Sequence, residues 1–318
     1  MTEFPSFVEI REEGPREGFQ IETGAISTAR KIELIDALSQ TGVSEIQAVS
    51  FVNPKRVPGM ADAGEVVKHI ALREGVRYTA LCLNAKGVER AVTYPQLDIY
   101  GSLITSASEK FLLKNQGINL RQNIDVQREM AGIYMSNSLP MERIAVMAAF
   151  GCNFQGEISS RQVIDGINEM ISLAGELGID PRIISLADTM AWATPLTIKQ
   201  TVGAVRERFP DHKLVLHLHD TRGMAIANAY AGLEMGIDMF DSAVGGLGGC
   251  PFAAHSGAAG NICTEDLVFM LHEMGIETGI DLEALIEVAA LAEDIVGHPL
   301  PGSVKTGGSL RALRANAA

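Results

Sequence analysis

Two histidines separated by a single residue are the clearest sign of chemistry in this sequence. His217 and His219 lie in the run KLVLHLHDTRG, whose alternating apolar residues predict a β-strand. Residues two apart on a strand point to the same face, so both imidazoles would project together near the strand's end. Because neutral imidazole is a common metal ligand, the pair predicts a metal site; two hydrogen-bonded structural histidines are the alternative.

The overall composition limits the class of protein that could carry this pair. The chain has 318 residues, enough for one large α/β domain or two ordinary ones. Its formal net charge of −13 argues against nucleic-acid binding, because no basic run is present to neutralise phosphates. Cys82, Cys152, Cys250 and Cys263 lie far apart, and the acidic start MTEFPSFVEIREE does not resemble a signal peptide. No apolar run approaches the ~18 residues of a membrane span, so we expect a soluble, reduced, cytoplasmic protein.

The elements that must position the histidines repeat one unit: a short strand, a loop and an amphipathic helix. Strands are predicted at 7–11, 45–52, 78–83, 97–105, 143–150, 182–187, 213–219 and 239–244. Helices are predicted at 27–39, 64–73, 87–92, 126–135, 161–175, 196–208, 225–235 and 265–273. Residues 106–123 look like an insertion between two of these units.

Eight such units in about 275 residues predict a (β/α)8 TIM barrel, a closed parallel barrel that typically takes ~250 residues. An open doubly wound sheet is the alternative. A further apolar-periodic helix at 282–293 follows the eighth unit, and the chain from Gly297 onward is rich in Gly, Pro and Ser. We therefore expect a single barrel domain over residues 1–296, including this extra C-terminal helix, and a flexible tail over 297–318.

The barrel predicts which polar residues meet, since its active-site groups lie at the C-terminal ends of the strands. Glu17 follows the first strand, His217 and His219 end the seventh, and Asn261 follows the eighth. Strands one, seven and eight are neighbours in a closed barrel, so these four side chains can converge. One carboxylate, two imidazoles and one amide oxygen suit Mg²⁺ or Mn²⁺ in an open octahedral site better than a closed zinc site.

Five runs of the sequence carry a family resemblance: EEGPREGFQ, VSFVNPKRVPGMAD, SLADT, HLHDTRGMAIAN and GLGGCPFAAHSGAAGNICTEDLV. They closely resemble the 3-hydroxy-3-methylglutaryl-CoA lyases, metal-dependent enzymes built on a TIM barrel, and the resemblance spans residues 7–272. The family's strand-one signature reads G-P-R-D-G: its arginine matches Arg16, whereas its aspartate matches Glu17. Its strand-two glutamate falls on Gln47, and a lysine common after the first motif falls on Thr23. These three positions depart from the family pattern.

The resemblance implies cleavage of a carbon–carbon bond in a β-hydroxy acyl-CoA, giving acetyl-CoA and a keto acid. Arg16 would stabilise the enolate oxygen, unless it is only a solvated loop charge. His217 would both bind metal and transfer protons, two roles that compete for its ring nitrogens. Cys250, in a glycine-rich loop, would close over the substrate as part of a lid; a buried packing cysteine is the alternative. Asp188 would act beside them on the substrate hydroxyl or on a ligand.

Further residues are predicted to support the substrate or the metal ligands: Gln20, Gln47, Ser50, Glu265 and Asp266. Glu265 and Asp266 have a simpler alternative as first-turn acids that suit a helix dipole. Lys55 and Arg56 are candidates for the CoA phosphates, and solvated surface charge is the alternative for both.

The departures at Glu17 and Gln47 indicate a site retuned for another substrate, because the number of ligands survives. Despite these departures, 3-hydroxy-3-methylglutaryl-CoA, the substrate that the resemblance implies, remains the expected one, with an Mg²⁺ or Mn²⁺ ion and, from the resemblance, a homodimer. Citramalyl-CoA, which would give pyruvate and acetyl-CoA, and a longer-branched 3-hydroxyglutaryl-CoA are alternatives. A Claisen-condensing synthase, a metal-dependent hydroxy-keto-acid aldolase and a non-catalytic CoA-ester sensor are further alternatives. Metal-dependent release of acetyl-CoA would separate the enzyme from the sensor.

Overall fold

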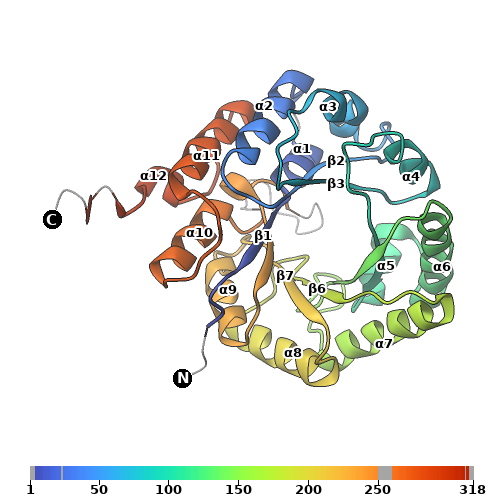
Figure 1. Ribbon diagram of the computed structural model, residues 1–318. Coiled ribbons are helices and arrows are strands. Elements are labelled where there is room, and N and C mark those ends of the chain that lie inside the picture. Colours follow the sequence, from blue (N-terminus) through green and yellow to red (C-terminus); the bar gives the residue numbers. More distant parts are fainter. Residues whose placement is uncertain (1–3, 23, 250–259, 312, 315–318) are drawn as a thin grey trace.

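Eight parallel strands form the centre of the molecule and helices surround them, as the computed structural model shows (Figure 1). The structure describes residues 4–22, 24–249, 260–311 and 313–314. The strands are β1 Glu9–Glu12, β2 Glu45–Ser50, β3 Arg77–Leu81, β4 Gly101–Ser106, β5 Met141–Met147, β6 Ile183–Ala187, β7 Lys213–His217 and β8 Met239–Ser242. Their order in the sheet is β3-β2-β1-β8-β7-β6-β5-β4. The backbone N–H of Asp98, just before β4, donates to Tyr78 O of β3 (2.8 Å), so the two ends of this order meet. The predicted (β/α)8 TIM barrel is confirmed, and the open sheet is wrong.

The predicted helices are present, with ends shifted by a few residues. The main helices are α2 Thr28–Ser39, α3 Ala63–His69, α4 Ala85–Ala91, α5 Glu109–Gln116, α6 Leu120–Ser136, α7 Ser160–Leu177, α8 Pro195–Arg208, α9 Ala225–Glu234, α10 Thr264–Glu273 and α11 Leu282–Val296. Shorter turns are η1 Gly14–Gly18, α1 Phe19–Ile21, η2 Pro58–Met60, η3 Val244–Gly246 and α12 Val304–Gly307. The stretch expected to be an insertion, 106–123, contains a helix that was not predicted, α5. Ser108 caps that helix by accepting from Phe111 N, and Gly117 ends it with φ +74°.

The apolar core lies between the strands and the helices. Ile46 on β2 and Leu216 on β7 are fully buried there, as are Leu34 on α2 and Val205 on α8. Each such side chain contributes roughly 1.5–3 kcal/mol relative to an exposed one. This layer stabilises the barrel and leaves the inward-facing strand positions free for other residues.

The inward-facing positions carry charge, whereas barrels of this type are usually filled by branched apolar side chains. Arg11 on β1 is in register with Glu45 on β2 and with Asp241 on β8, and Asp241 is in register with His217 on β7. The Arg11 Nε to Glu45 Oε2 distance is 3.5 Å. Arg143 on β5 donates to Asp241 Oδ1 (3.3 Å). A buried charged layer therefore lies directly beneath the histidines.

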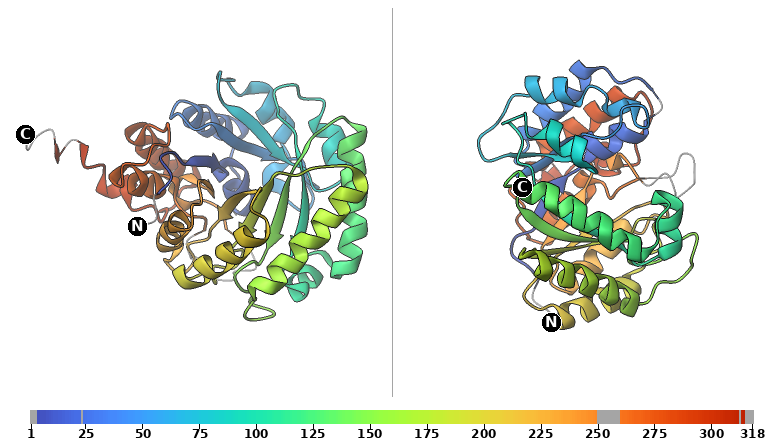
Figure 2. Two further views of the ribbon diagram at one scale, coloured as in Figure 1. Left: turned by 60° about the horizontal axis from the view of Figure 1, so that its bottom comes forward. Right: turned by 90° about the vertical axis from the view of Figure 1, so that its right-hand side faces the viewer.

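The segment after α11 contacts the barrel. α12 lies against α10 and α11 at the rim of the molecule (Figure 2). His298 Nε2 lies 3.0 Å from Glu22 Oε2, and Leu300 N donates to Glu293 Oε2 (2.8 Å). The flexibility expected for residues 297–318 stays a prediction.

Two expectations from composition can be compared with the described residues. Cys82, Cys152 and Cys263 are buried free thiols, which agrees with the expectation of a reduced protein. No helix in the described ranges combines the length and apolar character that crossing a bilayer requires.

Candidate active site

The turn that follows β1 carries two of the predicted site residues over the mouth of the barrel. Residues Gly14–Gly18 wind as one π-helical turn, and the turn contains Arg16 and Glu17. The buried carboxylate of Glu12 fixes its start by accepting hydrogen bonds from Gly14 N (2.7 Å), Val244 N (3.0 Å) and Thr264 Oγ1 (2.6 Å). Burial raises the pKa of Glu12 to about 7, against the effect of these three donors. Glu12 thus ties the turn to the segment after β8 and to α10.

The guanidinium of Arg16 is held on three sides. Its Nη2 lies 2.5 Å from Glu13 Oε2 and its Nη1 lies 2.9 Å from Glu17 Oε2. Its Nε donates to Gln47 Oε1 at the end of β2. Burial alone would lower the pKa of Arg16, but the neighbouring carboxylates outweigh burial and raise it, so the group stays charged. A charged planar donor fixed in this way cannot transfer a proton, but it can stabilise a developing anion.

His219 is buried and oriented from both sides. Its Nδ1 lies 2.8 Å from the backbone oxygen of Asp188 and its Nε2 lies 3.4 Å from Glu17 Oε1. A carbonyl oxygen can only accept, so Nδ1 carries the proton, and the lone pair of neutral His219 is on Nε2. That lone pair points toward the carboxylate of Glu17.

His217 has a similar orientation. Its Nδ1 lies 3.6 Å from Asp241 Oδ2 and 3.7 Å from Glu13 Oε2, and its Nε2 lies 3.9 Å from Glu17 Oε1. Burial opposes the imidazolium, but the hydrogen bond to Asp241 and the carboxylates of Glu17 and Glu13 outweigh burial and raise the pKa of His217 to about 9. Binding a metal through Nε2 would therefore displace a proton.

Asn261 completes the predicted group of four. It pairs with His219 across an isolated antiparallel bridge. Its Nδ2 donates to Leu247 O (3.0 Å), which leaves the amide oxygen as the available acceptor. A Cβ placed on Gly248 would lie 2.7 Å from Asn261 Nδ2 and 2.9 Å from Glu17 Cγ, so both side chains border the same glycine.

These residues fit a divalent cation. One ligand atom from each of Glu17, His217 and His219 lies within 4.8 Å of the others. Burial would raise the pKa of Glu17, but Arg16 and the two histidines outweigh it and hold the pKa well below the usual value, so the carboxylate is ionised. An ionised carboxylate, two imidazoles with oriented lone pairs and an amide oxygen form the mixed oxygen and nitrogen set expected for Mg²⁺ or Mn²⁺.

Asp188 orients its surroundings. Its carboxylate accepts from Trp192 N (2.8 Å) and Ala193 N (3.1 Å), while its backbone oxygen positions His219. Burial raises the pKa of Asp188 to about 6, against the effects of His219 and these N–H donors. The contacts explain why an acid follows β6, and its predicted catalytic role stays a prediction.

Glu265 and Asp266 lie in the first turn of α10, as their simpler alternative expects. Glu265 Oε2 accepts from Gly245 N (2.9 Å), which supports the glycine-rich segment after β8. Asp266 accepts from Ser303 N and Val304 N and so holds the C-terminal segment. Neither contact is with a metal-ligand candidate.

The remaining predicted residues lie around the mouth or beyond it. Ser50 Oγ donates to Gln20 Oε1 (3.4 Å), which links the end of β2 to α1. Lys55 and Arg56 are exposed on the loop after β2, and their contact with CoA stays a prediction. Cys250 lies outside the described residues.

Two acids at the site were not predicted from the sequence: Glu13 and Asp241. Both are buried, and both face Nδ1 of His217. The sequence held a signal for Asp241, since it is an isolated acid within a predicted buried strand, and such an acid needs a partner. Glu13 had a weaker signal as the second acid of a pair directly before the Gly-Pro turn.

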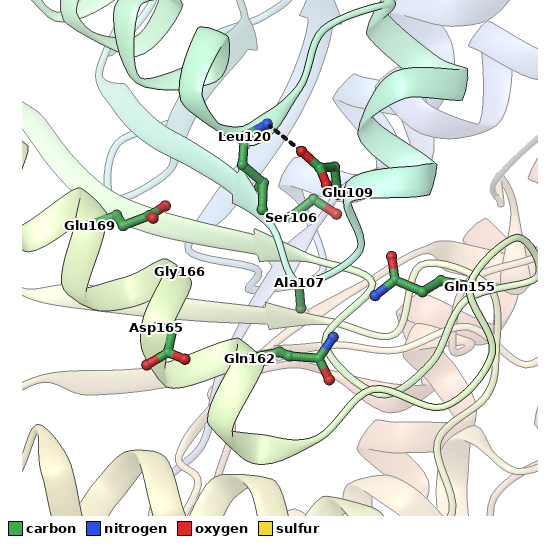
Figure 3. Close-up of a pocket in the computed structure, with 9 residues that line it drawn as sticks. All are labelled: Ser106, Ala107, Glu109, Leu120, Gln155, Gln162, Asp165, Gly166 and Glu169. Atoms are coloured by element: carbon green, nitrogen blue, oxygen red, sulfur yellow. Dashed lines mark hydrogen bonds between the residues drawn. The ribbon is translucent and has the colours of Figure 1, made fainter.

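A cavity of about 320 Å³ lies apart from this site, between the end of β4, α5 and α7. Figure 3 shows Glu109 on one side of it and Asp165 and Glu169 on α7 at the other. The lining includes three carboxylates and no lysine or arginine. Such a lining repels phosphates, so the cavity is a poor place for an acyl-CoA nucleotide.

Comparison with known proteins identifies the family to which this arrangement belongs. The family model described as HMGL-like matches residues 8–292. The chain belongs to the HMGL-like family. Curated members include the mitochondrial hydroxymethylglutaryl-CoA lyase of Gallus gallus, 39% identical over 89% of this chain and 92% of its own length. Hydroxymethylglutaryl-CoA lyase YngG of Bacillus subtilis is 38% identical over 94% of this chain and 96% of its own length.

Solved structures of HMG-CoA lyases share the family's fold with this chain. The enzyme from Pseudomonas aeruginosa superposes with a TM-score of 0.86 at 34% identity, covering 98% of this chain and 99% of that one. The enzyme from Acinetobacter baumannii, solved with coenzyme A and 3-methylmalate, superposes with a TM-score of 0.85 at 38% identity, covering 98% of each chain.

Proposed function

We propose that this chain is a divalent-metal-dependent lyase that cleaves 3-hydroxy-3-methylglutaryl-CoA into acetyl-CoA and a keto acid. The observation that carries the proposal is the convergence of Arg16, Glu17, His217 and His219 at the C-terminal mouth of the barrel. Two curated relatives, of which this chain covers 92% and 96%, are hydroxymethylglutaryl-CoA lyases, which are carbon–carbon lyases. Arg16 is the only one of the four that can neither ligate a cation nor titrate at neutral pH.

The residues at the mouth of the barrel have different chemical roles. Glu17, His217, His219 and Asn261 would hold Mg²⁺ or Mn²⁺. When bound, the ion supplies Lewis acidity that lowers the pKa of the substrate's tertiary hydroxyl. Arg16 would donate to the thioester oxygen as negative charge develops there after the bond breaks. Asp241 and Glu13 would hold the proton on Nδ1 of His217, which keeps its Nε2 lone pair directed at Glu17.

Proton transfer in the family scheme needs a group near the substrate hydroxyl. With Nε2 given to the ion and Nδ1 facing Asp241 and Glu13, His217 is better suited to ligation than to acid–base work. Cys250 and Asp188 remain the other predicted catalytic groups. Cys250 directly follows Gly249 in the sequence, and Gly245, Gly246, Gly248 and Gly249 all have positive φ, a conformation that glycine adopts without strain.

A related structure solved with coenzyme A supports an acyl-CoA as the substrate class. Lys55 and Arg56, exposed on the loop after β2, are the proposed phosphate contacts. A homodimer, from the family resemblance, and a reducing, cytoplasmic location, in keeping with the free thiols of Cys82, Cys152 and Cys263, also belong to the proposal.

Citramalyl-CoA is the second candidate substrate, and Glu17 and Gln47 favour it. Both positions depart from the family pattern, and both side chains contact Arg16. Glu17 and Gln47 are two of the three side chains that hold Arg16, the other being Glu13. Substitutions at both positions are expected if the enzyme releases a different keto acid. Pyruvate would then replace the larger product.

The test is acetyl-CoA release by purified protein with Mg²⁺ or Mn²⁺. 3-Hydroxy-3-methylglutaryl-CoA, citramalyl-CoA and a longer-branched analogue are compared, each with an EDTA control. Preference for the first substrate supports the proposal, and preference for the second makes Glu17 and Gln47 specificity determinants. Metal binding without turnover of any of the three would overturn the lyase assignment in favour of an aldolase or a sensor.

A further inference from the structure

Glu13 is a buried acid that contacts two functional groups at once. Its Oε2 lies 2.5 Å from Arg16 Nη2 and 3.7 Å from His217 Nδ1. Its backbone oxygen also accepts from Arg16 N (3.1 Å) and Glu17 N (2.8 Å), so the same residue fixes the turn that carries both side chains. The side chain is only 7% exposed, so its charge is compensated by these neighbours and not by water.

The charge around Arg16 is distributed differently from the family pattern. The resemblance places a glutamate at position 47, where this chain has Gln47, a neutral acceptor for Arg16 Nε. In this chain Glu13 lies on Nη2 of the same guanidinium. Arg16 therefore meets two carboxylates, Glu13 and Glu17, with an amide in the third direction. A glutamate at 47 in addition would bring three carboxylates onto one cation, and carboxylates that close disfavour one another's ionisation.

We propose that Glu13 is a positioning residue, and that it supplies from the end of β1 the carboxylate that the family places on β2 at position 47. It holds Arg16 for the developing enolate and holds the Nδ1 side of His217 for ligation, acting on substrate and cation only through these two groups. The inference rests on the proposed function for its catalytic part, and its metal-binding part stands independently.

The test is a double-mutant cycle of Glu13→Gln and Gln47→Glu. Glu13→Gln removes the charge with little change in size, so Arg16 loses its orientation, and kcat for acetyl-CoA release falls about 10- to 100-fold with little change in KM. Gln47→Glu alone adds a third carboxylate and also lowers kcat. In the Glu13→Gln background the same substitution restores the second carboxylate and raises kcat. The sign of the effect at position 47 thus depends on the residue at position 13.

A second readout needs no turnover. Isothermal titration with Mn²⁺ alone compares the Mn²⁺ affinity of the wild-type protein with that of Glu13→Gln. Loss of a residue that orients a metal-binding histidine typically weakens metal binding about 10- to 100-fold. The matched control is Glu45→Gln, a buried acid in the barrel interior that contacts Arg11 and not Arg16 or His217. We expect it to lower the thermal midpoint while leaving Mn²⁺ affinity unchanged.

The outcomes separate the inference from the proposed function. A wild-type protein that releases no acetyl-CoA refutes the function, while the Mn²⁺ titration still decides on Glu13. Unchanged Mn²⁺ affinity in Glu13→Gln, or an effect of Gln47→Glu with the same sign in both backgrounds, overturns the inference. If Glu13→Gln lacks a cooperative unfolding transition, Gln47→Glu in the wild-type background decides: a rise in kcat shows that the carboxylate was missing, and the inference is wrong.

Discussion

Replacing Gly248 by alanine should impair the site far more than the fold. Gly248 has φ +85°, and an added Cβ would lie 2.7 Å from Asn261 Nδ2 and 2.9 Å from Glu17 Cγ. Non-bonded carbon contacts are comfortable at about 3.5–4.0 Å, so the two neighbours must move by roughly 0.6–0.8 Å or more. The left-handed backbone adds about 1–2 kcal/mol of strain for any L-residue with a Cβ.

Gly178 provides the matched control for the backbone term. It ends α7 with φ +69°, and a Cβ added there meets no heavy atom within 4 Å. Gly178→Ala therefore carries the strain alone, and both variants should lose about 1–2 kcal/mol of stability. Because about 1 Å of misplacement at a site costs on the order of a hundredfold in rate, Gly248→Ala should lose tens-fold more in kcat/KM than the control.

Thermal unfolding, Mn²⁺ titration and acetyl-CoA release on both variants test this reasoning. The expected result is a similar fall in thermal midpoint for both variants, with loss of Mn²⁺ affinity and turnover only in Gly248→Ala. Equal Mn²⁺ affinity and equal kcat/KM in the two variants would refute the geometry, since Glu17 and Asn261 would then not depend on the space at Gly248.

Three further predictions concern single groups. Mn²⁺ at a hundred times its Kd should stabilise the wild-type protein by about 2.7 kcal/mol, and His219→Ala should abolish this effect in a thermal-shift assay; a retained shift would exclude His219 as a ligand. Arg16→Lys should lower kcat by about 10²–10³-fold, because an ammonium cannot reproduce the fork that meets Glu13, Glu17 and Gln47; near-normal kcat in a steady-state assay would contradict this. Burial raises the pKa of Glu265 from 4.5 to about 7, so its stabilising contribution is complete below pH 4.5 and is lost as pH rises through 7. Glu265→Gln should therefore gain up to about 3 kcal/mol over wild type at pH 8, with the gap closing toward pH 4.5 in urea unfolding; a gap independent of pH would contradict the shift.

The barrel could be predicted from the sequence because the strand–loop–helix pattern occurs eight times. Each strand and helix had its own hydrophobic period, and the eight units together left few alternatives. The helix α5 was missed because only eight residues, Glu109–Gln116, separate its caps, so its period is short. Ser108 and Gly117 were the available signals, a capping serine and a glycine at the end, and capping residues alone would have predicted it.

The site was predictable where chain order and barrel closure act together. Glu17, His217, His219 and Asn261 meet because β1, β7 and β8 are neighbours, which the topology alone dictates. Glu13 and Asp241 were not predicted, because their importance depends on which nitrogen of His217 they face. Side-chain direction at that level is set by local packing, which neither period nor spacing encodes.

Asp241 gives the interior of this barrel an unusual consequence for protein engineering. One of its oxygens accepts from Arg143 while the other faces Nδ1 of His217, so a single carboxylate serves both the structural floor and a ligand candidate. Removing Arg143 would leave a buried charge without its partner, a loss that typically costs 3–5 kcal/mol. Mutations selected for stability of the barrel interior and mutations selected for activity at His217 would therefore act on the same carboxylate. This shared residue would limit laboratory evolution toward new substrates. Replacing Arg143 and Asp241 together would avoid the unpaired charge but would also remove the carboxylate that faces Nδ1 of His217.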